Sequence, residues 1–450
     1  MTTNVVSLTR ARVTGVLGEY DHEFSIPSAD EFVILYGPNG VGKTKFLEII
    51  DAVSHLRISA LLMQPFSTIE LEYSDGSNLE ILLQHVEEHS SAGQPESVRL
   101  RLVLRIPDHD PINWVYAGDD FESWLLRSSP WRQIGGDLWE DRTDGETVYL
   151  DELRDRFGRQ TPGLSQPPDA VREFLQQVPS FLIETQRLRI EQANESRARV
   201  WFPPNSKERR QHRSRIAEQA ASIRDLVTAA QTEHSRITQQ LDRTFPNRVL
   251  EADVASLELD ADLIRARYNE QNSFRSRLGH VASVALEDAL SLPERDLEIW
   301  ERKLLSLYLD DTDRKLAPFE NLLQKIELLE QIINSRLLNK ELHVTDGEGL
   351  SVIHATARRG IELNSLSSGE QHEIILMIDL LFNVPQGAVV LIDEPEISLH
   401  VAWQLAFIPD VRRIAALAGF RFVVATHSPQ IINDSWDKSV RLGPREAPFQ

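Results

Sequence analysis

The sequence predicts an α/β fold that is interrupted by a long helical insertion. Three short apolar runs have the composition of buried parallel strands, namely EFVILYG (31–37), AVVLID (388–393) and FRFVVAT (420–426). The run KTKFLEIIDAVSHL (43–56) is amphipathic and predicts a helix that flanks these strands. Beyond Pro204, apolar residues recur at helical spacing up to about residue 340. We therefore expect a mixed sheet with flanking helices, whose N- and C-terminal parts join around a helical lobe.

Composition narrows the class of protein. The chain has 450 residues with 41% hydrophobic and 26% charged residues and a mean hydropathy of −0.30, as in ordered globular proteins. No apolar run approaches the roughly 18 residues that span a bilayer, and the N-terminus lacks the basic-then-apolar order of a signal peptide. We therefore expect a cytoplasmic protein with no membrane partner. Because the chain has no Cys, disulfides, thiol catalysis and Cys-based zinc sites are excluded.

The net charge of −21 argues against nucleic-acid binding over the whole surface. One segment has a positive charge balance, since Arg187–Arg215 contains nine Lys or Arg residues against three Glu. This segment is either a nucleic-acid contact or a solvated helix face, and the sequence leaves both interpretations open.

The pattern along the chain predicts five segments. These are an α/β segment with one helix (1–105), a loop-rich insertion (106–178), a strand with the loop after it (179–190), a helical lobe (191–340) and a second α/β segment (341–450). Within the first, STIELEYSDGSNLEILL (67–83) predicts a hairpin that turns at Asp75-Gly76. The insertion carries four tryptophans that form either a satellite core or a stacking platform for bases, and these are Trp114, Trp124, Trp131 and Trp139.

The helical lobe predicts a short antiparallel arm. Its first stripe recurs over about three heptads and consists of Ile216, Ala220, Ile223, Val227, Ala230, His234, Ile237 and Leu241. A second stripe consists of Leu322, Ile326, Leu329, Ile333 and Leu337, which we expect to pack back over the first. We expect FPNRVL (245–250) and the region of Gly279 to interrupt the helices. Three nearby carboxylates, Asp310, Asp311 and Asp313, are expected to cap a helix that contains Leu316 and Phe319, with a metal site as the alternative.

The strongest chemical motif is GPNGVGKT (37–44), which matches the P-loop pattern between a predicted strand and a predicted helix. Backbone N–H groups of such a loop surround a β-phosphate, Lys43 brings positive charge to the β- and γ-phosphate oxygens, and Thr44 offers a hydroxyl to Mg²⁺. The expected nucleotide-binding residues are Gly37, Pro38, Asn39, Gly40, Val41, Gly42, Lys43 and Thr44.

Two further strand ends carry reactive side chains. Asp393 and Glu394 follow the apolar run 388–393, so Asp393 is expected to hold Mg²⁺ through water and Glu394 to orient or deprotonate an attacking water. The alternative is that this pair only caps a helix. His427 follows the third strand and is expected to contact a γ-phosphate, the alternative being a buried structural histidine.

The stretch LSSGEQHE (366–373) opens a predicted helix. Ser367 and Glu370 have the spacing of a capping box. A Ser-Gly helix start also leaves N–H groups and a positive dipole end that can bind an anion.

The motifs GPNGVGKT, LSSGEQ, LIDEPEISLH and ATHS occur in the order of the Walker A, signature, Walker B with D-loop, and His-switch motifs of ABC-type ATPases. The chain thus resembles an ABC-type P-loop ATPase head, more narrowly the SMC-type, RecF-like and OLD branch with its AAA_21-like members. EPEISLHVAWQ and SSGEQHE particularly resemble standalone bacterial ATPases of the Septu and PARIS antiviral systems.

This resemblance implies ATP and Mg²⁺ as ligands and Glu394, His427 and Lys43 as catalytic residues. It also implies that Ser368, Gly369 and Glu370 reach the ATP of another subunit, so that the protein is a homodimer or a higher even-numbered oligomer. Gln186 in IETQRL (183–188) matches the position of the Gln switch and would bind the nucleotide and its Mg²⁺. His400 is expected to contact the neighbouring subunit.

At the level of the system, the resemblance implies a sensor or regulator in phage defence. The segment after His427 is too short for the Toprim domain of OLD-type nucleases, so we expect the chain itself not to be a nuclease and a separately encoded effector nuclease to be its partner. The alternative is an SMC- or RecF-like DNA-repair or chromosome-organising ATPase that clamps DNA through Arg187–Arg215.

Overall fold

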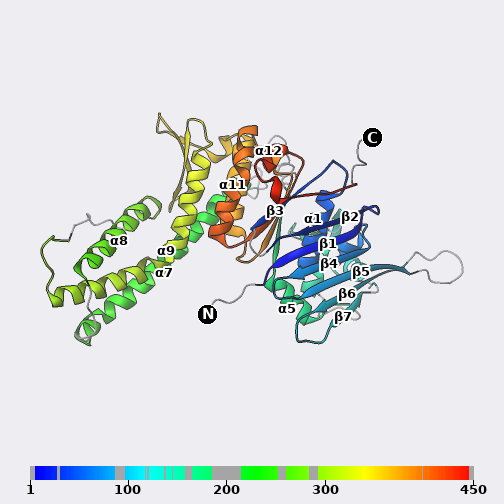
Figure 1. The fold of residues 1–450 in the computed structure, drawn as a ribbon, viewed down its shortest axis with the longest axis horizontal. Coiled ribbons are helices and arrows are strands. Elements are labelled where there is room, and N and C mark those ends of the chain that lie inside the picture. The colour runs from blue at the N-terminus through cyan, green and yellow to red at the C-terminus, as the bar shows by residue number, and fades with distance from the viewer. Residues whose placement is uncertain are drawn as a thin grey trace. The chain divides into compact units, whose positions relative to one another are not determined.

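The computed structural model describes residues 6–27, 31–86, 97–116, 118, 121–135, 138–143, 145–157, 165–184, 214–251, 260–282, 292–397 and 399–444. The chain forms two compact units (Figure 1). The head unit comprises Met1–Leu188 and Val384–Gln450, and the lobe unit comprises Arg189–Asn383.

The larger sheet of the head unit is antiparallel, with strand order β2-β1-β4-β5-β6-β7 (Figure 1). Its strands are β1 (Leu8–Val16), β2 (Tyr20–Ser25), β4 (Thr68–Tyr73), β5 (Asn78–Val86), β6 (Ser97–Arg105) and β7 (Ile112–Tyr116). The predicted hairpin at Asp75-Gly76 is confirmed, since β4 pairs with β5 and Asp75 accepts hydrogen bonds from the amide and the hydroxyl of Ser77. Gly76 has a φ of +86°, which glycine adopts at little cost.

The second sheet of the head unit is parallel throughout, with strand order β11-β15-β16-β3-β17. Its strands are β3 (Phe32–Tyr36), β11 (Ser180–Glu184), β15 (Val389–Asp393), β16 (Arg421–Thr426) and β17 (Ser439–Arg441). All five residues of β15 are buried, which explains its continuous apolar run. Because β3 lies between β16 and β17, the two ends of the chain share one sheet, as predicted.

Helix α1 (Lys43–Ser54) joins the two sheets into one core. Its apolar residues, Phe46, Leu47, Ile49, Ile50 and Val53, pack in the same cluster as Leu71 of the antiparallel sheet and Leu391 of the parallel one. The other helical segments of the head unit include α2 (Ile58–Leu62), α11 (Val401–Ala418) and α12 (Pro429–Ile432). The α/β head with a helical insertion is therefore confirmed.

The segment 106–178 contains more regular structure than the sequence predicted. Its first strand, β7, completes the antiparallel sheet, and a small sheet of order β10-β9-β8 follows. The remaining elements are α3 (Phe121–Ser128), β8 (Trp131–Gly135), β9 (Leu138–Asp141), β10 (Thr147–Tyr149), α4 (Leu150–Phe157) and α5 (Asp169–Gln177). The prediction of a loop-rich insertion is wrong here because these elements are too short for a periodic apolar pattern to mark them.

Three of the four tryptophans of this segment belong to a satellite core, one of the two alternatives above. Trp131 and Trp139 are buried with Phe121 and Leu153, and Trp124 packs against them. Trp114 packs instead against the main core of the head unit. Their side chains therefore serve packing.

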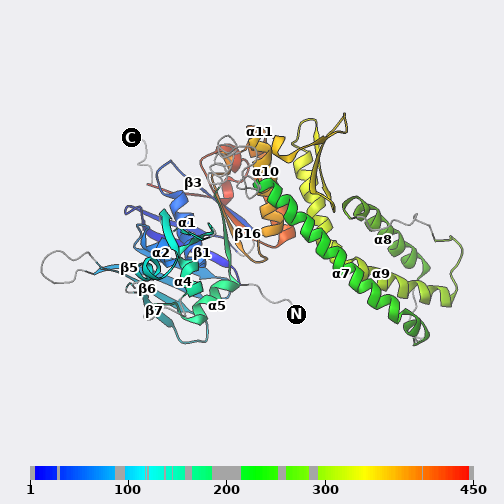
Figure 2. The same cartoon turned by 180° about the vertical axis from the view of Figure 1, so that it is seen from behind.

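The described part of the lobe unit contains four α-helices and a small antiparallel sheet. Helices α7 and α9 lie side by side (Figure 2). Its elements are α7 (Arg215–Glu251), α8 (Ala261–Val281), α9 (Ile299–Asn334), β12 (Lys340–Thr345), β13 (Gly349–His354), β14 (Gly360–Ile361) and α10 (Ser368–Ile378). The predicted antiparallel return is confirmed. His234 of α7 bonds the Lys315 carbonyl of α9, whereas Arg248, later in α7, pairs with the earlier Asp311.

One of the two predicted interruptions of these helices is wrong, because helix α7 continues through Pro246 to Glu251. The other agrees with the structure, since α8 ends at Val281, two residues after Gly279. A proline inside a helix costs about 3 kcal/mol, but tertiary contacts offset this. Here Arg248, two residues later, donates to the Leu241 carbonyl and to Asp311 on α9, which holds the last turns of α7.

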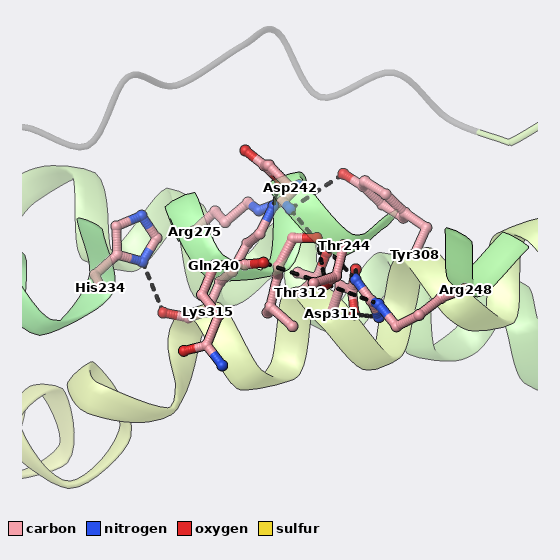
Figure 3. A network of polar contacts seen from close by, with 11 residues as sticks. His234, Gln240, Asp242, Thr244, Arg248, Arg275, Tyr308, Asp311, Thr312 and Lys315 are labelled. Carbon is pink, nitrogen blue, oxygen red and sulfur yellow. Dashed lines mark hydrogen bonds and ion pairs between the residues drawn. The ribbon is translucent and has the colours of Figure 1, made fainter. Parts of the chain in front are cut away.

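The prediction for Asp310, Asp311 and Asp313 is also wrong, because they lie inside α9 and cap nothing. Asp311 is buried and pairs with Arg248 (Figure 3). Asp310 and Asp313 both pair with Arg267 of α8. The cluster is thus the polar link that ties α7 and α8 to α9.

Among the residues that the structure describes, no helix combines the length and the apolar character needed to span a membrane.

Candidate nucleotide site

The P-loop runs from the end of β3 to the start of α1, as its sequence context predicts. Gly40 and Gly42 have φ values of +85° and +87°, where a side chain would be strained. At Gly37 a Cβ atom would lie 2.4 Å from the Leu442 carbonyl oxygen. These three glycines let the backbone follow a path that is closed to other residues, while Pro38 and Asn39 remain exposed to an incoming ligand.

Lys43, at the start of α1, folds back over this loop. Its Nζ donates to the Gly37 carbonyl at 2.9 Å and to the Pro38 carbonyl at 3.1 Å. Burial lowers the pKa of Lys43, and the carboxylates of Glu394, Asp393 and Glu396 oppose that shift. The ammonium group therefore sits at the loop where a phosphate would bind.

Thr44 and Asp393 meet although 349 positions separate them in the chain. The Thr44 hydroxyl donates to Oδ2 of Asp393 at 2.8 Å, and Asp393 is the last residue of β15. Both groups are oxygen ligands beside a phosphate-binding loop, which is the type of donor set that Mg²⁺ uses together with nucleotide phosphates. The residues present therefore fit this ion.

Glu394 follows Asp393 in a backbone conformation that is unusual for a residue with a side chain. Its φ is +46°, and its amide donates to the Ala425 carbonyl at 2.8 Å. Such strain persists where the surrounding structure imposes it, and it is common at functional sites. The turn directs Glu394 toward His427, whose Nδ1 lies 3.6 Å from Glu394 Oε1. Parallel pairing of β15, β16 and β3 brings all three strand ends to one edge.

Glu396 was not singled out from the sequence, yet it organises the turn that carries His427. Its buried Oε1 accepts hydrogen bonds from the Thr426 hydroxyl at 2.7 Å, the His427 amide at 2.8 Å and the Ser428 amide at 3.1 Å. His427 Nδ1 lies 3.2 Å from the same oxygen. The available signal was a second acidic residue two positions after Glu394 in DEPE.

Replacing Glu396 by Gln should therefore destabilise the protein by about 1–3 kcal/mol, because an amide cannot replace the charged acceptor of three donors. Urea unfolding of the full chain measures this change. The matched control is Glu394→Gln, two positions earlier, which should change stability less because the same three donors do not point to it. Equal stability of Glu396→Gln and the unmodified protein would contradict the assignment.

His22 is a second residue that sequence reasoning missed. It is 1% exposed, and its Nε2 lies 2.6 Å from the Val41 carbonyl oxygen. Its ring stacks on Tyr20 and packs edge-on against Phe46 of α1. His22 thus fixes the P-loop to the antiparallel sheet, and no local pattern in the sequence marks it.

The capping box in the lobe unit is confirmed. Ser367 is the N-cap of α10 and accepts from the Glu370 amide, while Glu370 accepts from the Ser367 amide. Burial would raise the pKa of Glu370, but hydrogen bonds from Lys340 and Ser367 outweigh it and lower the pKa. The Glu370 carboxylate is therefore engaged in capping, whereas Ser368 is exposed in the first turn beside Gly369.

Three other predicted positions are placed only in part. Gln186 lies outside the described residues, although β11 leads toward it and pairs Glu184 with Asp393. Of the basic segment, residues 187–213 lie outside the described part of the chain, and Arg215 pairs with Asp379. His400 immediately precedes α11.

Comparisons with solved structures return heads of SMC proteins. The Smc head domain of Pyrococcus furiosus, with an extended coiled coil and bound to the C-terminal domain of ScpA, is 14% identical with a TM-score of 0.36, over 95% of this chain and 91% of that chain. An SmcHead bound to the C-winged helix domain of ScpA is 11% identical with a TM-score of 0.37, over 98% and 94%. The SMC head domain from Thermotoga maritima is 13% identical with a TM-score of 0.32, over 98% and 100%. These values are too low to support an argument about function.

A search of the curated proteins finds no match. A family model described as "AAA domain, putative AbiEii toxin, Type IV TA system" matches residues 32–433, a span that includes the P-loop, Asp393 and His427. The chain therefore belongs to the AAA_21 family of AAA-domain ATPases.

Proposed function

We propose that the chain binds ATP with Mg²⁺ at the P-loop and hydrolyses it with Glu394 and His427. The observation that carries this proposal is the hydrogen bond between Thr44 and Asp393, because it brings the P-loop and the acidic strand end to one place. Lys43 would neutralise phosphate charge, and Gln186 would complete the nucleotide and metal contacts.

In this proposal the side chains have distinct tasks. Thr44 and Asp393 hold Mg²⁺, which neutralises charge on the phosphate oxygens when it is bound. Glu394 accepts a proton from the attacking water or orients it. His427 contacts the γ-phosphate, and Glu396 keeps its turn in place.

We further propose that two copies share each ATP, with Ser368 and Gly369 of one copy facing the P-loop of the other. In support, α10 presents Ser368 and bare N–H groups at an exposed, capped N-terminus, which is a favourable site for an anion. ATP then stabilises the pair, and hydrolysis weakens it because the γ-phosphate contact is lost.

The full chain should therefore form dimers with a slowly hydrolysed ATP analogue and Mg²⁺, but not with ADP. Light scattering after size-exclusion chromatography measures this shift. Ser368→Arg should abolish dimerisation while leaving ATP affinity within about twofold, because the substituted residue serves the partner's nucleotide. Ser365→Arg, at a position that is also exposed and three residues earlier, is the matched control. Dimers that persist in Ser368→Arg would contradict the shared site.

At the level of the system we propose a sensor or regulator in bacterial phage defence that controls a separately encoded effector nuclease. Support comes from the likeness of EPEISLHVAWQ and SSGEQHE to ATPases of the Septu and PARIS systems, and from the family description, which names a putative toxin. The product of the neighbouring gene tests this proposed role in phage defence. A nuclease encoded there would support the role, and a membrane permease would contradict it.

A further inference from the structure

A cavity of about 340 Å³ lies in the head unit, outside the residues assigned to the nucleotide. The segment after α1, the start of α2, the end of β7, α4 and α5 line it. Its volume is at the lower end of the range of about 300–1,000 Å³ that is typical of small-molecule sites. It is therefore large enough for a ligand of sugar-phosphate size.

The charged groups around this cavity are mainly basic. Arg154, Arg172 and His55 line it together with one carboxylate, Asp151. Asp151 accepts from the Ser59 amide at 3.2 Å and from the Ser59 hydroxyl at 3.4 Å, and its Oδ1 lies 3.8 Å from Arg154 Nε. Basic side chains thus outnumber acidic ones in this lining, in a chain whose net charge is −21.

The position of Arg154 is fixed before any ligand arrives. Its guanidinium carbon lies 5.0 Å from the centre of the Phe121 ring and 5.7 Å from that of Tyr116. The Tyr116 hydroxyl accepts from Arg154 at 3.3 Å, and the Arg154 side chain is 11% exposed. A guanidinium held in this way loses little conformational entropy when it binds a planar or tetrahedral oxyanion.

His55 also lines the cavity, and its Nδ1 lies 3.3 Å from Asp51 Oδ1. A hydrogen bond to Asp51 raises the pKa of His55, and Asp51 is itself held by Arg57 and by the Ser180 hydroxyl at 2.8 Å. The rest of the lining is mixed, with apolar surface from Leu56, Ile58 and Leu175 and polar groups from serine and glutamine side chains. The cavity thus offers both oxyanion contacts and apolar surface.

We propose that this cavity is a second binding site, independent of the P-loop, for a small organic oxyanion that carries a phosphate or a carboxylate group. Arg154 and Arg172 bind the oxyanion, and Leu56, Ile58 and Leu175 contact its carbon skeleton. This proposal does not depend on ATP hydrolysis, since none of these residues belongs to the P-loop or to the end of β15.

Calorimetric titration of the full chain carrying Lys43→Ala, which weakens phosphate binding at the P-loop, tests the site. The probes are ribose 5-phosphate for the phosphate source, citrate for the carboxylate source and ribose as the neutral control. One oxyanion should bind at a single site at least about tenfold more tightly than ribose, because each charge-assisted contact contributes on that order. The probe that binds shows whether the site recognises a phosphate or a carboxylate group.

Arg172→Gln and Arg154→Gln, each in this background, should weaken that binding by about tenfold. Arg99→Gln, which removes an exposed positive charge on β6, is the matched control and should leave it unchanged. Thermal unfolding shows whether each variant is folded. If Arg154→Gln does not fold, Arg172→Gln alone tests the proposal. The proposal is overturned if neither oxyanion binds more tightly than ribose, or if Arg172→Gln binds as tightly as Arg99→Gln.

Discussion

Replacing Glu394 by Gln should lower the ATP hydrolysis rate by about 10²-fold or more while ATP still binds. The physical reason is that an amide cannot take the proton of the attacking water, whereas the proposed contacts of Lys43 with the phosphates and of Thr44 with Mg²⁺ do not involve Glu394. ATP should therefore remain bound, and the dimer that it stabilises should accumulate. Phosphate release and light scattering in the presence of ATP measure both effects in one sample.

The matched control for this variant is Asp437→Asn, which removes an exposed carboxylate of the same unit and should leave both measurements unchanged. Comparison of Glu394→Gln with Glu396→Gln separates chemistry from structure. The first should lose turnover at nearly unchanged stability, and the second should lose stability as well. An unaltered hydrolysis rate in Glu394→Gln would remove Glu394 from its proposed role.

The elements around the nucleotide site could be predicted because local patterns determine them. Residues 31–44 combine an apolar strand, glycines that need positive φ values and an amphipathic helix, so strand, loop and helix follow from adjacent residues. The same holds for the capping box at Ser367 and Glu370. The P-loop follows strand β3, and Asp393 ends strand β15. Contact between Thr44 and Asp393 therefore follows once these two strands are placed in one parallel sheet, because their carboxyl ends lie at the same edge.

The failed predictions for Pro246 and for the three aspartates of α9 share a physical cause, which is that tertiary contacts override local preference. Pro246 was expected to end a helix, but the pairing of Arg248 with Asp311 holds the last turns of α7. The acidic residues in YLDDTDRK resembled helix caps because their neighbours in sequence do not show what they pair with. Their arginine partners lie 43 to 63 positions away. No pattern within one element records such partners.

The same reasoning explains why supporting residues of the site were missed. Glu396 acts on Thr426, 30 positions later, and His22 acts on Val41, 19 positions later. Each is a single polar residue in a strand or turn of ordinary composition. Their importance comes from burial and from the donors or acceptors that the fold brings to them, so it becomes visible only in three dimensions.

Mixing two inactive variants should restore ATP hydrolysis, and this result would be specific to a shared site. Lys43→Ala lacks a working P-loop, and Ser368→Arg lacks a working signature helix, so homodimers of either variant contain no intact site. A mixed dimer contains one site with Lys43 from one copy and Ser368 from the other. Because one of the two sites of a mixed dimer is intact, an equal mixture should hydrolyse ATP faster than the two variants measured separately.

The double variant Lys43→Ala/Ser368→Arg is the matched control for this mixture. It supplies neither a P-loop lysine nor a signature serine, so its mixture with either single variant contains no intact site and should stay inactive. If each copy instead hydrolysed ATP alone, the mixture of the two single variants would be no more active than the two variants measured separately. Recovery in the first mixture and none in the control mixtures would therefore distinguish a shared site from a self-sufficient one.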